Sequence, residues 1–242
     1  MAQLGYGYGS EFHLMRLMGR YRKRFTSLVC KATEASDMQW LDFKVGQQYQ
    51  LSPNNLILPD KEWKGIDFLE KSSTDNDSIL KEWQKFWPQT GNIQNWDAIA
   101  RSRFGFPEFW LLAEAKAHTG EINSQCGAQS SRSKDKIKKA MQKTQSWLDV
   151  QGKTPDDWMK NYYQFANRLA TLYFLIEQGI HARLLFIYMC GDKHPEKECP
   201  KKREGWTTVL KKQKQALGLQ NVDLKSHGVH EIFIDVEKVT IM

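Results

Sequence analysis

Three charged residues, Asp97, Glu114 and Lys116, are of types that suit phosphodiester hydrolysis if the fold brings them together. Glu114 and Lys116 lie two residues apart in the run FWLLAEAKAH, and side chains at this spacing share one face of a strand. Charges inside an apolar strand are costly unless they are paired or functional. Two carboxylates can hold a hard cation that activates water, and the lysine can orient or deprotonate that water.

A plainer interpretation uses the same residues. The triplet E-x-K is common, so Glu114 and Lys116 can form an ion pair on a solvent-facing strand while Asp97 lies in an unrelated turn. The runs NWDAIA and FWLLAEAKAH flank a connection that contains Gly and Pro, which predicts a β-hairpin. Pairing of its strands would bring Asp97 close to the face that carries Glu114 and Lys116.

A helix is expected near the N-terminus. Ser10 is a suitable N-cap for a helix from about Glu11 to Cys30, whose apolar residues recur at helical spacing. Glu11 shares the core-facing stripe with Leu14 and Met18. Its carboxylate therefore either stabilises the positive end of the helix dipole or points inward at a site.

Helices and strands alternate in the rest of the chain. The expected elements are a basic helix over 132–149, a long helix from Thr154 to Gly179, a buried strand over 182–190, a helix over 205–217 and an edge strand over 230–238. Because helices connect the hairpin to the buried strand, these strands should be parallel. The sequence thus predicts an α/β fold, a mixed central β-sheet flanked by helices, in one domain over 1–242.

The spacing of the charged residues resembles that of the PD-(D/E)XK, or restriction-endonuclease-like, nuclease superfamily. Asp97 is followed by sixteen residues and then by the triplet EAK at 114–116. In that superfamily the Asp opens one strand of a hairpin, the E-x-K lies on the next, and an N-terminal helix often adds an acidic residue, which Glu11 matches. Trp96 departs from the family pattern, in which a proline precedes the Asp.

The resemblance covers about residues 10–190 and implies a fold and an activity. The implied core is helix, three strands, helix and strand. The implied activity is Mg²⁺- or Mn²⁺-dependent hydrolysis of nucleic acid, with Asp97, Glu114 and Glu11 as metal ligands and Lys116 acting on the water. We expect DNA rather than RNA as the substrate, in restriction, repair or defence. The alternative is a catalytically inactive nucleic-acid-binding module with the same fold.

Other residues are weaker candidates for the same site. Gln164 lies on the long helix, where relatives often place a polar residue, His118 shares the face of Glu114, and Glu121 follows the strand. Each has a structural alternative: a helix-surface residue, a hydrogen-bonded histidine and a solvated loop carboxylate. The spacing of Cys190, His194 and Cys199 supplies three zinc ligands without an evident fourth.

Composition limits the class of partner. Thirty-five Lys and Arg against 28 Asp and Glu give a net charge of +7, which favours a polyanion. The N-terminal residues lack a signal-peptide pattern, no apolar run reaches membrane-spanning length, and four scattered Cys suit a reducing compartment. We therefore expect a cytoplasmic protein without a membrane partner, and a homodimer stays open.

Overall fold

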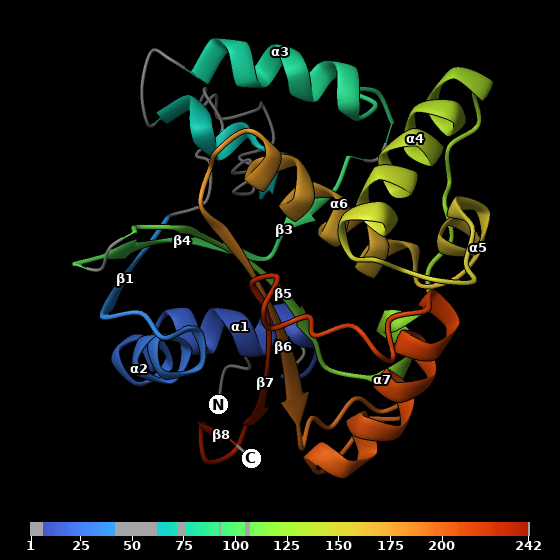
Figure 1. Ribbon diagram of the computed structural model, residues 1–242. Coiled ribbons are helices and arrows are strands. Elements are labelled where there is room, and N and C mark those ends of the chain that lie inside the picture. Colours follow the sequence, from blue (N-terminus) through green and yellow to red (C-terminus); the bar gives the residue numbers. More distant parts are fainter. Residues whose placement is uncertain (1–6, 42–61, 72–75, 92, 105–106, 242) are drawn as a thin grey trace, which may run out of the picture.

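A six-stranded mixed sheet organises the chain (Figure 1). The computed structural model describes residues 7–41, 62–71, 76–91, 93–104 and 107–241. In spatial order the strands are β1 (Asp37–Trp40), β4 (Ala98–Arg103), β5 (Trp110–Lys116), β6 (Ala182–Cys190), β7 (Val229–Asp235) and β8 (Thr240–Ile241). β1, β4 and β5 pair antiparallel, β5, β6 and β7 pair parallel, and β8 pairs antiparallel with β7. The predicted mixed sheet, hairpin and parallel β5–β6 pair are confirmed.

Helices cover both faces of this sheet (Figure 1). One face carries α1 (Ser10–Met18) and α2 (Arg22–Thr33). The other face carries α3 (Asp77–Phe86), α4 (Ser131–Trp147), α5 (Pro155–Lys160), α6 (Tyr163–Glu177) and α7 (Arg203–Leu217). A short ladder of β2 (Trp63–Lys64) and β3 (Asn95–Trp96) and two 3₁₀ turns (Asp67–Lys71 and Thr119–Ile122) complete the described elements.

β5 contributes to both layers. Ala113, Ala115 and Ala117 pack in the core under α1 and α2, where small side chains let the helices approach closely. Leu112 packs in the core under α4 and α6. Because side chains alternate along a strand, Glu114 and Lys116 point to this second face. Glu114 and Lys116 therefore lie between the sheet and α6, away from the N-terminal helices.

Two of the expected long helices are broken. The first ends at Gly19, whose N–H donates to the Met15 carbonyl, and the chain resumes as α2 at Arg22. The second divides into α5 and α6 at Tyr162, which has a positive φ of 54°. The α6 start is tied to the loop after β5, since the Gln164 N–H donates to the Ser124 hydroxyl at 2.8 Å. This tertiary hydrogen bond was not visible in the helical periodicity.

The C-terminal strand was wrongly expected to be an edge. β7 pairs with β6 on one side and with β8 on the other, and Ile232, Phe233 and Ile234 are buried. The turn after Asp235 returns the chain as β8, which becomes the edge. Within the described segments, no helix has the length and apolar character needed to cross a bilayer. The sequence QWLDFKV over 39–45 also has the pattern of a strand, and the structure describes it only as far as Leu41.

Candidate active site

The β4–β5 register brings two carboxylates together. Ala98 pairs with Ala113, so continuing the register by one residue sets Asp97 opposite Glu114. Residues opposite one another in an antiparallel pair point to the same face. The Asp97 Oδ2 atom also accepts a hydrogen bond from the Ala115 N–H at 2.6 Å. The structure therefore places Asp97 beside the E-x-K strand, not in an unrelated turn.

Glu114 is a buried carboxylate with two cationic partners. Its side chain is 2% exposed, and Oε1 pairs with the Lys116 ammonium. Oε2 accepts from Arg168 Nε at 2.8 Å and lies 2.7 Å from Arg168 Nη2. Burial opposes ionisation, but the charges of Arg168 and Lys116 outweigh it and lower the pKa of Glu114. Glu114 is therefore an anion at neutral pH.

Arg168 links Glu114 to the surrounding backbone. Its Nη2 donates to the Asn95 carbonyl at 2.6 Å and its Nη1 to the Asn167 side-chain oxygen at 2.9 Å. The guanidinium carbon lies 4.7 Å from the centre of the Trp96 ring, a cation–π contact. One buried side chain thus joins β3, β5 and α6. Sequence reasoning missed this role, although an arginine in the apolar run of α6 was a usable signal.

Asp97 differs electrostatically from Glu114. Burial, followed by repulsion from Glu114, raises the pKa of Asp97 to about 7, against partial opposition from Lys116. Its Oδ1 atom accepts no hydrogen bond from any of the described residues, and Asp97 lines an open groove. Glu114 is therefore ionised at neutral pH, whereas Asp97 keeps its proton to a higher pH than an ordinary aspartate.

A groove of about 770 Å³ begins at Asp97. Its walls come from the segment that leads into β4, the loop between β5 and α4, the N-terminus of α4 and the first turns of α6. Gln164 lines it, and also lines a small enclosed cavity with Glu114 and Lys116. Gln164 thus lies where the sequence placed it, beside the charged residues.

His118 and Glu121 lie past the end of β5. The Glu121 carboxylate accepts from the Ala117 N–H at 2.8 Å and lies 3.3 Å from His118 Nε2. The hydroxyl of Ser10 is also within 3.5 Å of Glu121. These contacts join α1 to the end of β5. They give His118 the hydrogen-bonded role that was its alternative, whereas Glu121 is held by three partners and is not a solvated loop carboxylate. Neither residue lines the groove or the enclosed cavity.

Glu11 does not point inward. It is exposed in the first turn of α1, whereas Leu14 and Leu17 are buried, so the expected core-facing stripe was assigned wrongly. α1 packs on the sheet face opposite to Glu114. The position in the first turn suits the helix dipole. The structure does not bring Glu11 together with Asp97 and Glu114.

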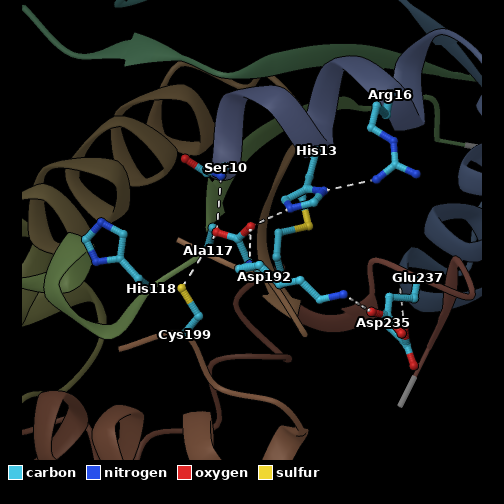
Figure 2. Close-up of polar contacts among 12 residues, drawn as sticks. Ser10, His13, Arg16, Ala117, His118, Asp192, Cys199, Asp235 and Glu237 are labelled. Carbon is cyan, nitrogen blue, oxygen red and sulfur yellow. Dashed lines mark hydrogen bonds and ion pairs between the residues drawn. The ribbon is translucent and has the colours of Figure 1, made fainter. Parts of the chain in front are cut away.

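A second polar cluster lies at the end of β6 (Figure 2). Asp192 accepts from His13 Nε2 at 2.8 Å, from the Gly9 N–H at 3.1 Å and from the Lys193 N–H at 2.8 Å. The Cys199 thiol lies 3.7 Å from the same carboxylate. With its oxygens occupied in this way, Asp192 holds the start of α1 against the sheet.

The zinc alternative finds no supporting geometry. Cys190 is buried in β6, and burial raises the pKa of its thiol to about 11. Cys199 contacts Asp192, and no set of three or more His, Cys, Asp or Glu in the described segments is arranged to hold a metal ion.

Comparisons with protein-family models, with curated proteins and with solved structures found no match to this chain.

Proposed function

We propose that this chain is a metal-dependent nuclease that hydrolyses phosphodiester bonds, with DNA favoured over RNA. The observation that carries the proposal is the pairing of Asp97 with Glu114 on one sheet face, beside Lys116 and at a groove. The order of β1, β4, β5 and β6, with helices before β1 and before β6, supports a restriction-endonuclease-like core. The net charge of +7 favours a polyanionic substrate.

The oxygen donors fit Mg²⁺ or Mn²⁺, which are held by one or two carboxylates together with substrate oxygens. Asp97 offers its free Oδ1 atom, and Glu114 offers the Oε1 atom that it shares with Lys116. When bound, the cation would lower the pKa of water and neutralise charge on the phosphate. Asp97 would give up its proton to bind, which matches a pKa of about 7.

Lys116 and Gln164 would act on the substrate. The Lys116 ammonium is almost buried and lies at the same carboxylate, so it can orient the attacking water and balance negative charge at the phosphate. Gln164, at the junction of the groove and the inner cavity, can donate a hydrogen bond to a phosphate oxygen. Arg168 is a positioning residue, because its guanidinium donates to Glu114, Asn167 and Asn95 of the protein itself.

A cleavage assay tests the proposal. The purified protein is incubated with plasmid, linear DNA and RNA in the presence of Mg²⁺, Mn²⁺ or EDTA. We expect cleavage that EDTA abolishes and that Glu114→Gln reduces by at least a hundredfold. Glu108→Gln is the matched control, because Glu108 pairs with Arg101 on the exposed rim of the same hairpin and should leave cleavage unchanged.

A second candidate is an inactive nucleic-acid-binding module. It is favoured by one observation: Glu114 is already neutralised by Lys116 and Arg168, as a structural ion pair would be. Such a module would bind DNA in EDTA, weaken with salt through counterion release, and cut nothing with any metal. Binding without cleavage in the assay above would select this candidate over the nuclease.

A further inference from the structure

The groove beside Asp97 has an unusual wall for a nucleic-acid site. Arg168 is the one cation among the described residues that line it, and its guanidinium is occupied by Glu114, Asn95 and Asn167. Side-chain amides dominate the polar lining instead, and they belong to Gln94, Asn95, Gln125, Gln129, Gln164 and Asn167. Such a wall suits a neutral, hydrogen-bonding group better than a phosphate.

Two of these amides have an unused acceptor. The Oε1 atom of Gln94 and the Oδ1 atom of Asn95 are buried and accept no hydrogen bond. Thr171 donates its hydroxyl to the Asn167 carbonyl and so accepts from Gln94 Nε2 at 2.6 Å, which leaves the oxygen as the end of the Gln94 amide without a partner. A buried acceptor without a donor costs about 1–3 kcal/mol. A ligand that donates hydrogen bonds here would recover that loss.

The size and remaining surface of the groove define the ligand further. Its volume of about 770 Å³ lies within the roughly 300–1,000 Å³ of small-molecule sites. Trp87 and Tyr163 add aromatic surface to the lining. Ser130 and Ser133 lie at the N-terminus of α4, and the positive end of a helix dipole favours a negative group nearby. The fitting ligand is flat, has N–H donors on its edge, and is attached to a phosphate.

We propose that this groove binds an unpaired nucleobase, so that the protein acts on single-stranded or locally opened nucleic acid. Every base carries N–H donors on its Watson–Crick edge, and these are free only when the base is unpaired. Rotation about the terminal amide torsion, which is a broad well, turns the Asn95 oxygen to the bound edge, and Gln94 turns in the same way by giving up its hydrogen bond to Thr171. The choice of nucleic acid as ligand class rests on the proposed function, but base binding needs no cleavage.

Binding in EDTA tests this inference separately from catalysis. Fluorescence anisotropy would compare a labelled 12-nucleotide oligo(dA), an abasic strand of the same length and a 12-base-pair duplex. We expect oligo(dA) to bind at least tenfold more tightly than either of the others. Equal affinity for all three would overturn the inference, because backbone charge alone would then explain binding.

Variants locate the contact. Gln94→Met removes the unused acceptor at similar size, and Gln125→Ala changes an exposed wall residue that the fold does not need. Each should weaken oligo(dA) binding about tenfold and leave the abasic strand unchanged, whereas Gln215→Ala, exposed on α7, should change neither. Unchanged oligo(dA) binding in Gln125→Ala and in folded Gln94→Met would also overturn the inference.

The two proposals fail in different ways. Metal-dependent cleavage without base-dependent binding would remove the base-binding inference and leave the nuclease assignment. Base-dependent binding without cleavage under any metal would remove the nuclease assignment and leave the groove as a binding site for unpaired bases.

Discussion

Replacing Arg168 by methionine is the sharpest test of how the site is held together. The substitution removes a guanidinium that is 3% exposed and that neutralises a Glu114 side chain 2% exposed. Methionine keeps much of the aliphatic length but donates no hydrogen bond. Among the described residues, Lys116 would remain as the cationic partner of Glu114. The variant therefore isolates the contribution of Arg168 to a buried ion-pair network.

The expected cost follows from the contacts that disappear. Removing one partner of a buried ion pair costs about 3–5 kcal/mol when the other charge is left alone. Lys116 keeps part of that neutralisation, which lowers the cost, while the lost hydrogen bonds to Asn95 and Asn167 raise it by about 1 kcal/mol each. We expect Arg168→Met to lower the free energy of unfolding by about 3 kcal/mol.

Urea denaturation at pH 7.5 measures this cost, and a double-mutant cycle assigns it to the pair. Glu114→Gln removes the charge that Arg168 neutralises, so the double variant should be about 2 kcal/mol more stable than the sum of the single changes predicts. Because Arg168 lowers the pKa of Glu114, the deficit of Arg168→Met should also shrink as the pH falls below the ordinary pKa of a glutamate. Additive single changes, or a cost below about 1 kcal/mol, would refute the account of this network.

Three further perturbations have defined outcomes. The pKa of Asp97 is raised to about 7, so ionising this residue lowers the stability of the protein as the pH rises from about 4 to 7. Asp97→Asn should therefore have the same free energy of unfolding as the wild type at pH 4. At pH 8 its free energy of unfolding should be higher by at least about 1.4 kcal/mol, as measured by urea denaturation. Asp192→Ala should lower the free energy of unfolding by about 2–4 kcal/mol in the same assay, because His13 and the Gly9 and Lys193 amides lose their acceptor. Asp192→Asn should recover part of the lost stability. Equal stability of the wild type and both variants would contradict the role assigned to these hydrogen bonds. Glu11→Gln should lower the free energy of unfolding by about 0.3–1 kcal/mol and leave cleavage unchanged, because Glu11 is an exposed residue in the first turn of α1. A large loss of cleavage with unchanged stability would instead show that Glu11 belongs to the active site.

The predictable part of the structure rests on local patterns. Two apolar runs around a connection that contains Gly and Pro predicted the β4–β5 hairpin, and the spacing of Glu114 and Lys116 put them on one face. The hairpin also predicted that Asp97 would come near this face, whereas the register that sets it opposite Glu114 came from the structure. Strand 182–190 was also predicted with its bounds, because a continuous apolar run between a helix and a polar loop has few other interpretations.

The unpredicted part depends on tertiary contacts. Helical periodicity continues through Tyr162, and the break there arises from hydrogen bonds between the start of α6 and Ser124, forty residues or so earlier. The burial of Glu11 was misjudged because its stripe was drawn along one continuous helix to Cys30, whereas the helix breaks at Gly19 and α1 buries Leu14 and Leu17. The pairing of Arg168 with Glu114 joins positions 54 apart, which no local pattern encodes.

The central claim is that Asp97 and Glu114 bind a divalent cation, and calorimetric titration with Mn²⁺ tests it directly. At pH 6.5, in two buffers of different ionisation enthalpy, we expect saturable binding of Mn²⁺ with release of part of a proton, because cation binding must deprotonate Asp97. Asp97→Asn and Glu114→Gln should each abolish this binding, and Glu108→Gln should leave it unchanged. Absence of saturable binding to the wild type, or equal binding to all four proteins, would contradict the account.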